Sequence, residues 1–318
     1  MVDPRLIRIG TRDSKLALAQ TRWVAAALAQ RFPSLQAETV CIKTKGDQIV
    51  DKPLDSSLGK GFFVKEIEEQ MLAGHIDIAV HSLKDLPTEL PEGLTLAALC
   101  KRIEARDAVV LPSVEQNASL PSGNAELNLS VLPKNARVGT SSLRRQAQLR
   151  YSQPSLKLKP LRGNVDTRLR KLDDGGYDAI VVAAAGLIRL GLSKRIGFLL
   201  PLSICVPAAG QGALAIEARR DDLMTLEILA HLDDPRVRAE ATAERATVSE
   251  FNAGCHSAFG VYATSGNKKM SIHAAVASLD GGLVLREFVS GSGCEAEALG
   301  RTLAGRLFDR GAAKLLEG

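Results

Sequence analysis

The sequence predicts an α/β fold followed by a smaller α+β region, and two observations support this. Strand-like apolar runs alternate with helical segments up to about residue 221, as in α/β sheets. From about Asp222 two helical segments precede three alternating strands, which is typical of an antiparallel sheet. The chain has 318 residues, of which 45% are hydrophobic and 24% charged, so its composition is globular and its length suits two or three domains.

The first region opens with the short strand Leu6–Ile9 and a turn into a helix that Ser14 or Asp13 can cap. Strands that alternate with helices pair in parallel, and ligand sites gather at the carboxyl ends of such strands. The turn at Arg12 and the turn at Lys84 both lie at such ends. We expect strands at 6–9, 38–42 and 76–80, helices at 15–31 and 63–73, and a long polar loop at 46–61.

The second region repeats the alternation, with a polar insertion at 114–130 that predicts a surface loop. We expect strands at 107–111, 137–140, 156–161 and 177–183, and helices at 165–172 and 185–190. A further helix begins at Ser141 or Ser142 and runs to about Arg150. A proline-containing crossing then leads to a strand at 211–217 that can return to the first region.

The last region predicts helices at 223–231 and 236–251, strands near 258–263, 270–278 and 283–289, and a final helix at 295–307. We therefore divide the chain into three domains. Domain 1 comprises residues 1–103 and 210–221, domain 2 residues 104–209, and domain 3 residues 222–318.

Several protein classes are disfavoured. No apolar run approaches the ~20 residues of a membrane-spanning helix, and the polar N-terminus lacks the pattern of a signal peptide, so we expect a cytoplasmic protein. The five cysteines are widely spaced without a CxxC pair, which argues against a disulfide framework or a zinc site.

The net charge of +5 is concentrated in one stretch. Residues 131–195 hold 14 Lys or Arg against 4 Asp or Glu, and the flanking segments are close to neutral or mildly acidic. Such a local field favours an anionic partner, although a solvated basic face is the ordinary alternative. Seven of the ten basic residues from Arg137 to Lys171 are arginine, whose planar fork binds carboxylate or phosphate in bidentate fashion.

The arginines fall at turns beside helix N-termini, where free backbone N–H groups attract anions. Nucleic-acid binding would favour aromatic side chains among the basic residues, but only Tyr151 interrupts them, and no phosphate-binding loop motif is present. The pattern therefore favours a cleft for a small anion.

Two further residues are candidates for chemistry. Asp85 follows a strand and adjoins Lys84, so it is a candidate general acid or base, although a lone loop aspartate more often caps a turn. Cys255 lies between Gly254 and His256, which suits an exposed thiol, although a buried structural cysteine fits equally well. His81 is more simply read as a structural strand histidine.

Taken in order, several segments resemble the porphobilinogen deaminase family of tetrapyrrole biosynthesis along nearly the whole chain. The segments are Thr11–Leu18, Gly59–Glu66, His81–Pro87, Gly139–Gln146, Leu161–Leu169 and Pro207–Gly212.

The resemblance implies two periplasmic-binding-protein-like lobes and a small C-terminal α+β domain with a three-stranded antiparallel sheet. In this family a cysteine of the third domain holds a dipyrromethane cofactor through a thioether, and Cys255 occupies that position here. The family joins four porphobilinogen units head to tail on this primer, releases ammonia from each, and hydrolyses off 1-hydroxymethylbilane. Around the cysteine the family usually has Gly-Gly-Cys, whereas this chain has Ala253-Gly254-Cys255.

The resemblance also implies roles for individual residues. Asp85 would contact pyrrole N–H groups, assist the loss of ammonia and manage the proton lost after coupling. The segment 46–61 would be a lid. The substrate carboxylates would be bound by Arg12, Arg144, Arg145, Arg162, Arg168 and Arg189. The cofactor would be bound by Cys255, Lys84, Ser14, Ser82, Thr140, Ser142, Arg144, Arg145 and Arg162.

We expect porphobilinogen as the partner, and a monomer that binds neither nucleic acid, membrane nor metal. Two alternatives stay open. A non-catalytic two-lobed binder of a small polycarboxylate explains the arginines but neither Asp85 nor Cys255, and a nucleic-acid-binding protein explains only the charge.

Overall fold

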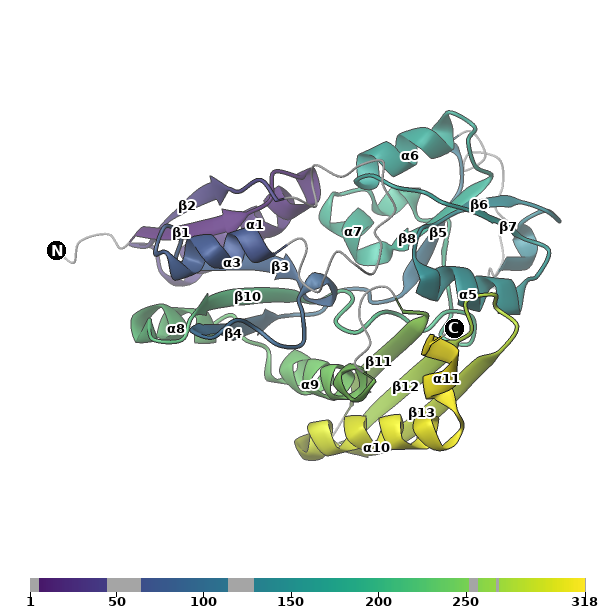
Figure 1. Cartoon of the computed structure of the whole chain (residues 1–318). Coiled ribbons are helices and arrows are strands. Elements are labelled where there is room, and N and C mark those ends of the chain that lie inside the picture. Colours follow the sequence, from purple (N-terminus) through teal and green to yellow (C-terminus); the bar gives the residue numbers. More distant parts are fainter. Residues whose placement is uncertain (1–5, 45–63, 114–128, 252–256, 267–268, 318) are drawn as a thin grey trace. The chain divides into compact units, whose positions relative to one another are not determined.

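The computed structural model describes residues 6–44, 64–113, 129–251, 257–266 and 269–317 (Figure 1). Its contacts divide the chain into two compact units. Unit 1 comprises Met1–Ile103 and Ala213–Arg238, and unit 2 comprises Glu104–Gly212 and Ala239–Gly318. Among the described residues no helix is long and apolar enough to cross a membrane.

Unit 1 is built on a five-stranded sheet with the strand order β2-β1-β3-β10-β4. β1 pairs in parallel with β2 and β3, whereas β10 runs antiparallel to both of its neighbours. The strands are β1 (Leu6–Thr11), β2 (Gln36–Cys41), β3 (Ile78–Ser82), β4 (Leu94–Cys100) and β10 (Leu214–Arg219), and the helices are α1 (Lys15–Arg31), α3 (Lys65–Leu72) and α8 (Leu223–Ala230).

Helices cover both faces of this sheet. Ile78 and Val80 of β3 share a core cluster with Val24 and Leu28 of α1. Ala79 of β3 belongs instead to the cluster that includes Ile67 and Met71 of α3. Since successive strand residues point to opposite faces, α1 and α3 pack on opposite sides of the sheet.

Unit 2 contains a second five-stranded sheet with the order β7-β6-β8-β5-β9. Its strands are β5 (Asp107–Val110), β6 (Arg137–Gly139), β7 (Lys157–Lys159), β8 (Ala179–Ala183) and β9 (Phe198–Leu199). Its helices are α5 (Leu143–Ser152), α6 (Val165–Asp173) and α7 (Ala184–Arg189), with short 3-10 turns at Leu129–Val131 and Ser193–Arg195.

The expectation of parallel pairing is correct for only part of each sheet. β6 is parallel to β7 and β8, but β5 is antiparallel to β8 and β9, as β10 is to β3 and β4. In each sheet the reversed strand lies fourth in the order and adjoins a segment where the chain crosses between regions. A strand that arrives from such a crossing, rather than from a neighbouring βα unit, is free to run the other way.

The remaining part of unit 2 is the predicted antiparallel sheet. β11 (Phe259–Ser265), β12 (Lys269–Ala277) and β13 (Val284–Ser292) pair in sequence order. The helices here are α9 (Pro235–Glu250, whose first four residues lie in unit 1), α10 (Ala296–Asp309) and α11 (Ala312–Glu317), with a 3-10 turn at Gly293–Glu295. The chain thus has the predicted mixed α/β class, with two α/β sheets and a three-stranded antiparallel sheet.

Replacing either of two glycines of α10 by alanine should change stability in opposite directions. A Cβ at Gly300 would lie against the carbonyl oxygen of Ala243 in α9 and 3.0 Å from the Cβ of Ala246, whereas a Cβ at Gly305 meets nothing within 4 Å. We expect Gly300→Ala to lower the free energy of unfolding by about 1–3 kcal/mol through overpacking. Gly305→Ala should raise it by up to about 1 kcal/mol through helix propensity. Urea unfolding followed by circular dichroism measures both, and equal effects would contradict the close packing of α9 on α10.

Candidate active site

Unit 1 places its predicted site residues on two turns, one after β1 and one after β3. Arg12 follows the last residue of β1, and Ser14 caps α1 by accepting a hydrogen bond from the Ala17 N–H at 3.2 Å. Of the two cap candidates, Ser14 is therefore the cap. The cap fixes the chain direction between Arg12 and the helix.

The turn after β3 carries Lys84 and Asp85 in a 3-10 turn, Leu83–Asp85. Leu83 is 2% exposed, and its N–H donates to the Ala213 carbonyl at 3.1 Å, whereas Asp85 is exposed. The buried leucine therefore anchors the turn, and the carboxylate of Asp85 stands outside the core.

Ser82, the last residue of β3, has a partner that the sequence did not reveal. Its hydroxyl accepts a hydrogen bond from the side chain of Gln20 at 2.8 Å. Gln20 is 4% exposed on α1, and a buried amide on an apolar helix face is the available sequence signal for such a role.

In unit 2 the turn from β6 into α5 holds Thr140 and Ser142. Ser142 caps α5, since its hydroxyl accepts from the Arg145 N–H at 3.4 Å, and its own N–H donates to the hydroxyl of the buried Thr140 at 3.3 Å. The hydroxyl of Ser141 accepts a hydrogen bond from the Leu161 N–H at 3.0 Å and donates one to the Leu161 carbonyl at 2.9 Å. These bonds join the turn after β6 to the turn that presents Arg162.

Arg144 and Arg145 are buried, and both contact one carboxylate. Nη1 of Arg144 lies 2.7 Å from Oδ2 of Asp107, and Nε and Nη2 of Arg145 lie 3.0 and 2.8 Å from Oδ1. Asp107, the first residue of β5, has no exposed surface. Burial raises the pKa of Asp107, but the charges of the two arginines outweigh it and hold the pKa well below its usual range.

The same carboxylate also binds the crossing segment at 205–211. The side-chain amide of Gln211 donates to Oδ1 at 2.8 Å, and the thiol of Cys205 lies 3.4 Å from Oδ2. Arg144 additionally donates to the Val206 carbonyl at 2.7 Å. Burial raises the pKa of the Cys205 thiol to about 12, so this cysteine is a protonated packing residue and no nucleophile.

The pair Arg144–Arg145 therefore has an internal counter-ion that the sequence did not reveal. With Asp107 the cluster keeps one net positive charge, and a guanidinium has five N–H donors, more than the described acceptors take from either arginine.

Arg162, Arg168 and Arg189 lie on other turns and helices of unit 2. Gly163, at φ +107°, supplies the left-handed conformation that turns the chain into α6, and its carbonyl accepts from Nε of Arg168 at 2.6 Å. Arg189 ends α7 and donates to the Gly212 carbonyl at 2.8 Å. Each of these two arginines is thus oriented by a backbone carbonyl.

The structure groups the predicted residues within each unit. Unit 1 holds Arg12, Ser14, Ser82, Lys84 and Asp85, and unit 2 holds Thr140, Ser142, Arg144, Arg145, Arg162, Arg168 and Arg189. Cys255, the segment 46–61 and most of the insertion 114–130 lie outside the described residues.

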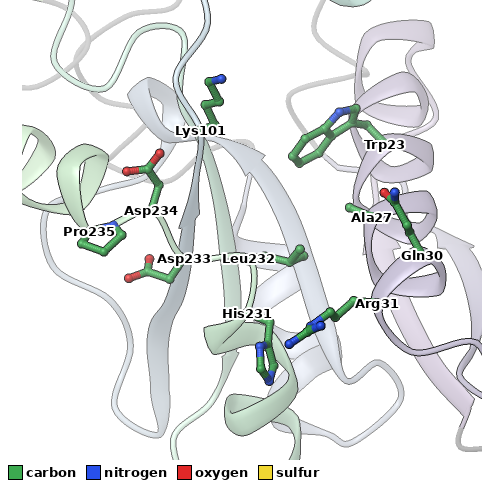
Figure 2. Close-up of a pocket in the computed structure, with 10 residues that line it drawn as sticks. All are labelled: Trp23, Ala27, Gln30, Arg31, Lys101, His231, Leu232, Asp233, Asp234 and Pro235. Carbon is green, nitrogen blue, oxygen red and sulfur yellow. The ribbon is translucent and has the colours of Figure 1, made fainter.

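A surface pocket of unit 1 involves none of these side chains. It lies between α1, the end of β4 and the α8–α9 connection, with Trp23 and Arg31 on one side and Asp233 and Asp234 on the other (Figure 2). Asp233 accepts from the Leu99 N–H at 2.7 Å and pairs with Arg238, and Asp234 accepts from backbone N–H groups that begin α9. These carboxylates support the local fold and are not arranged for catalysis.

Comparison with known proteins decides the family. The model for "Porphobilinogen deaminase, dipyromethane cofactor binding domain" matches residues 7–227, and the model for "Porphobilinogen deaminase, C-terminal domain" matches residues 238–309. The chain belongs to the porphobilinogen deaminase family. The resemblance based on the sequence motifs is thereby confirmed.

Members of this family match along the full length. A porphobilinogen deaminase of Pelobacter propionicus is 45% identical over 314 residues, covering 99% of this chain and 97% of that protein. One of Roseiflexus castenholzii is 48% identical over 312 residues, covering 98% and 99%. Among solved structures, the BenM effector binding domain with benzoate has a TM-score of 0.41 at 17% identity, covering 71% of this chain and 91% of that one, which is too distant to support any argument.

The Asp107 cluster predicts a large loss of stability when its carboxylate is removed. Asp107→Asn leaves two arginines without their buried counter-ion, which should lower the free energy of unfolding by about 3–5 kcal/mol. Urea unfolding monitored by circular dichroism measures it. Asp178→Asn is the matched control, because it breaks the half-exposed ion pair with Arg137 and should change the midpoint little. Equal midpoints for the two variants would contradict the central role of Asp107.

Proposed function

We propose that this chain is a porphobilinogen deaminase that joins four porphobilinogen molecules head to tail, releases ammonia from each, and hydrolyses off 1-hydroxymethylbilane. The observation that carries the proposal is the family match along both regions, 7–227 and 238–309. The exposed Asp85 and the basic turns of unit 2 supply the groups that this chemistry requires. A non-catalytic polycarboxylate binder is not favoured, since it gives Asp85 no role.

The dipyrromethane cofactor suits the donor set of this chain. Each pyrrole carries an acetate and a propionate, and the predicted ligands are guanidinium, ammonium and hydroxyl groups with Asp85 as the acid among them. We assign cofactor binding to Lys84, Ser14, Ser82, Thr140, Ser142, Arg144, Arg145 and Arg162, with covalent attachment at Cys255. When bound, the cofactor supplies the terminal pyrrole carbon to which the first substrate is joined.

Asp85 carries the acid–base work in this proposal. Its carboxylate can accept hydrogen bonds from pyrrole N–H groups and stabilise the cationic carbon formed when ammonia leaves. It can then receive the proton lost after coupling. Because Leu83 anchors the turn in the core, the carboxylate is held in a fixed direction while it remains accessible.

The arginines bind and orient the substrate carboxylates. We assign Arg12, Arg144, Arg145, Arg162, Arg168 and Arg189 to this role. Arg144 and Arg145 act as one site with a single net positive charge, because Asp107 neutralises the other. Arg168 and Arg189 are held by backbone carbonyls, which restricts the directions of their remaining donors.

We further propose a three-domain organisation, with domain 1 at 1–103 and 210–221, domain 2 at 104–209 and domain 3 at 222–318. The segment 46–61 would act as a lid. We propose a cytoplasmic monomer that takes porphobilinogen as its partner and binds neither nucleic acid nor a membrane. Gel filtration with light scattering tests the monomer.

Replacing Asp85 by glutamate tests the catalytic role. Asp85→Glu keeps the charge but moves it by about one C–C bond, and a misplacement of about 1 Å typically costs about a hundredfold in rate. We expect turnover of porphobilinogen to fall about a hundredfold with the cofactor still attached. Asp221→Glu, an exposed acid at the turn between β10 and α8, is the control and should leave turnover unchanged. Near-normal turnover of Asp85→Glu would refute the role.

The covalent attachment is tested by intact mass. The purified protein should weigh about two pyrrole units more than its polypeptide and react with Ehrlich's reagent. Cys255→Ser should show the bare mass and no colour, because a hydroxyl cannot form the thioether. Cys294→Ser, a free exposed cysteine, should keep the adduct. An adduct that survives in Cys255→Ser would place the linkage elsewhere.

A further inference from the structure

Three buried titratable side chains meet on the α3 face of the first sheet. They are Glu68 of α3, His81 of β3 and Glu217 of β10, which are 7%, 6% and 0% exposed. Nε2 of His81 lies 3.2 Å from Oε2 of Glu217. Glu217 pairs with Ala79 in the antiparallel register, two residues before His81, so the two side chains are diagonal neighbours on one face.

The cluster is poorly satisfied by hydrogen bonds. Among the described residues, Nε2 of His81, both carboxylate oxygens of Glu217 and Oε1 of Glu68 are buried without a hydrogen-bond partner. The contact between His81 and Glu217 is therefore electrostatic and not a well-aligned hydrogen bond. Ile67 and Met71, fully buried on the same helix, give Glu68 an apolar setting, in which an unsatisfied charge is costly.

Protonation of Glu68 removes its buried charge and so reduces that cost. Burial raises the pKa of Glu68 to about 7, and the negative charges of Glu217 and Glu69 add to the effect. Glu68 therefore holds a proton below neutral pH. Above neutral pH its negative charge acts on that of Glu217.

Other charged groups near the cluster are engaged elsewhere or acidic. Arg219, two residues beyond Glu217, donates to the Met71 and Ile76 carbonyls and contacts Asp77, which in turn binds Arg8 of β1. On α3, Glu66 and Glu69 add negative charge. Within the described residues, His81 is the basic side chain that pairs with Glu217.

The position of His81 links this cluster to the catalytic turn. His81 immediately precedes Ser82, and the turn with Lys84 and Asp85 begins one residue later. The β3–β10 pairing continues to Leu214 opposite Ser82, and Leu83 still bonds the Ala213 carbonyl.

We propose that Glu68, His81 and Glu217 are positioning residues that hold the end of β3, and with it the Lys84–Asp85 turn, against β10 while Glu68 carries a proton. This inference rests on the proposed catalytic role of Asp85. When Glu68 ionises, its negative charge repels that of Glu217, and the clamp beside the turn weakens.

The test uses the holoenzyme and the pH dependence of kcat. For the parent we expect kcat to fall as pH rises through about 7, with KM changing less. Glu68→Gln, which stays neutral and nearly isosteric, should shift this fall upward by at least about one pH unit, with kcat at pH 6 within about twofold of the parent. His81→Gln should lower kcat about tenfold and remove the fall, because the clamp is absent throughout.

A matched control comes from the same helix. Glu69→Gln removes an exposed carboxylate whose charge raises the pKa of Glu68, so it should move the fall slightly to lower pH. The opposite directions expected for Glu68→Gln and Glu69→Gln separate the buried group from a general effect of removing one negative charge.

A second readout does not depend on catalysis. Since the pKa of Glu68 is raised in the folded state, its stabilising contribution is complete below about pH 4.5 and is lost as pH rises through about 7. The Tm of the parent should therefore fall between pH 6 and 8, and that of Glu68→Gln should fall less. A Tm effect with an unchanged kcat profile would overturn the positioning role. Near-normal turnover of Asp85→Glu would overturn the proposed catalytic role, and the Tm measurement would still report on the cluster.

Discussion

The ion pairs of the buried Asp107 carboxylate are the interaction on which the first sheet of unit 2 depends. It joins β5 to α5 through two arginines and to the crossing segment through Gln211 and Cys205. A fully buried charge is tolerated only when its partners surround it, so every element that contributes a donor is held in a fixed relation to β5. The basic residues that follow at the turns are thereby presented from a rigid base.

Two buried ionic clusters among the described residues have opposite charge surpluses. Around Asp107 two arginines outweigh one acid, and in the proposed function the surplus positive charge meets a substrate carboxylate. Around His81 two acids outweigh one imidazole, and the surplus negative charge is removed by proton uptake at Glu68. The first cluster is fixed at any physiological pH because arginine does not titrate there, whereas the second responds to pH near neutrality. The proposed binding of anions and the proposed positioning of the Lys84–Asp85 turn thus have different physical bases.

Much of this fold could be predicted from local pattern. The alternation of strands and helices predicted most of both lobes, and the cap at Ser14 follows from its place before an apolar helix. β4, at Leu94–Cys100, was missed because its apolar residues do not alternate with polar ones. The antiparallel course of β5 and β10 was missed because strand direction depends on where the chain crosses, and local residues do not encode that crossing.

The sequence revealed the charged donors of the proposed site but not the buried acid that pairs with two of them. Arg144 and Arg145 could be identified in the sequence by their charge. Asp107 could not, because it lies at the start of an apolar strand and its partners are 37 and 38 residues away. Glu68 does have a signal in the sequence, because an acidic residue interrupts the buried face of an otherwise amphipathic helix.

Each turn that presents a functional side chain also has a buried residue beside it. Leu83 precedes Lys84, and Leu161, held twice by Ser141, precedes Arg162. A donor on a free loop would lose side-chain and backbone entropy on binding, whereas a donor next to a buried anchor has already lost part of it on folding. In the proposed function, the free energy of the hydrophobic cores thus contributes to substrate orientation, because packing residues and the proposed binding residues are interleaved along these turns.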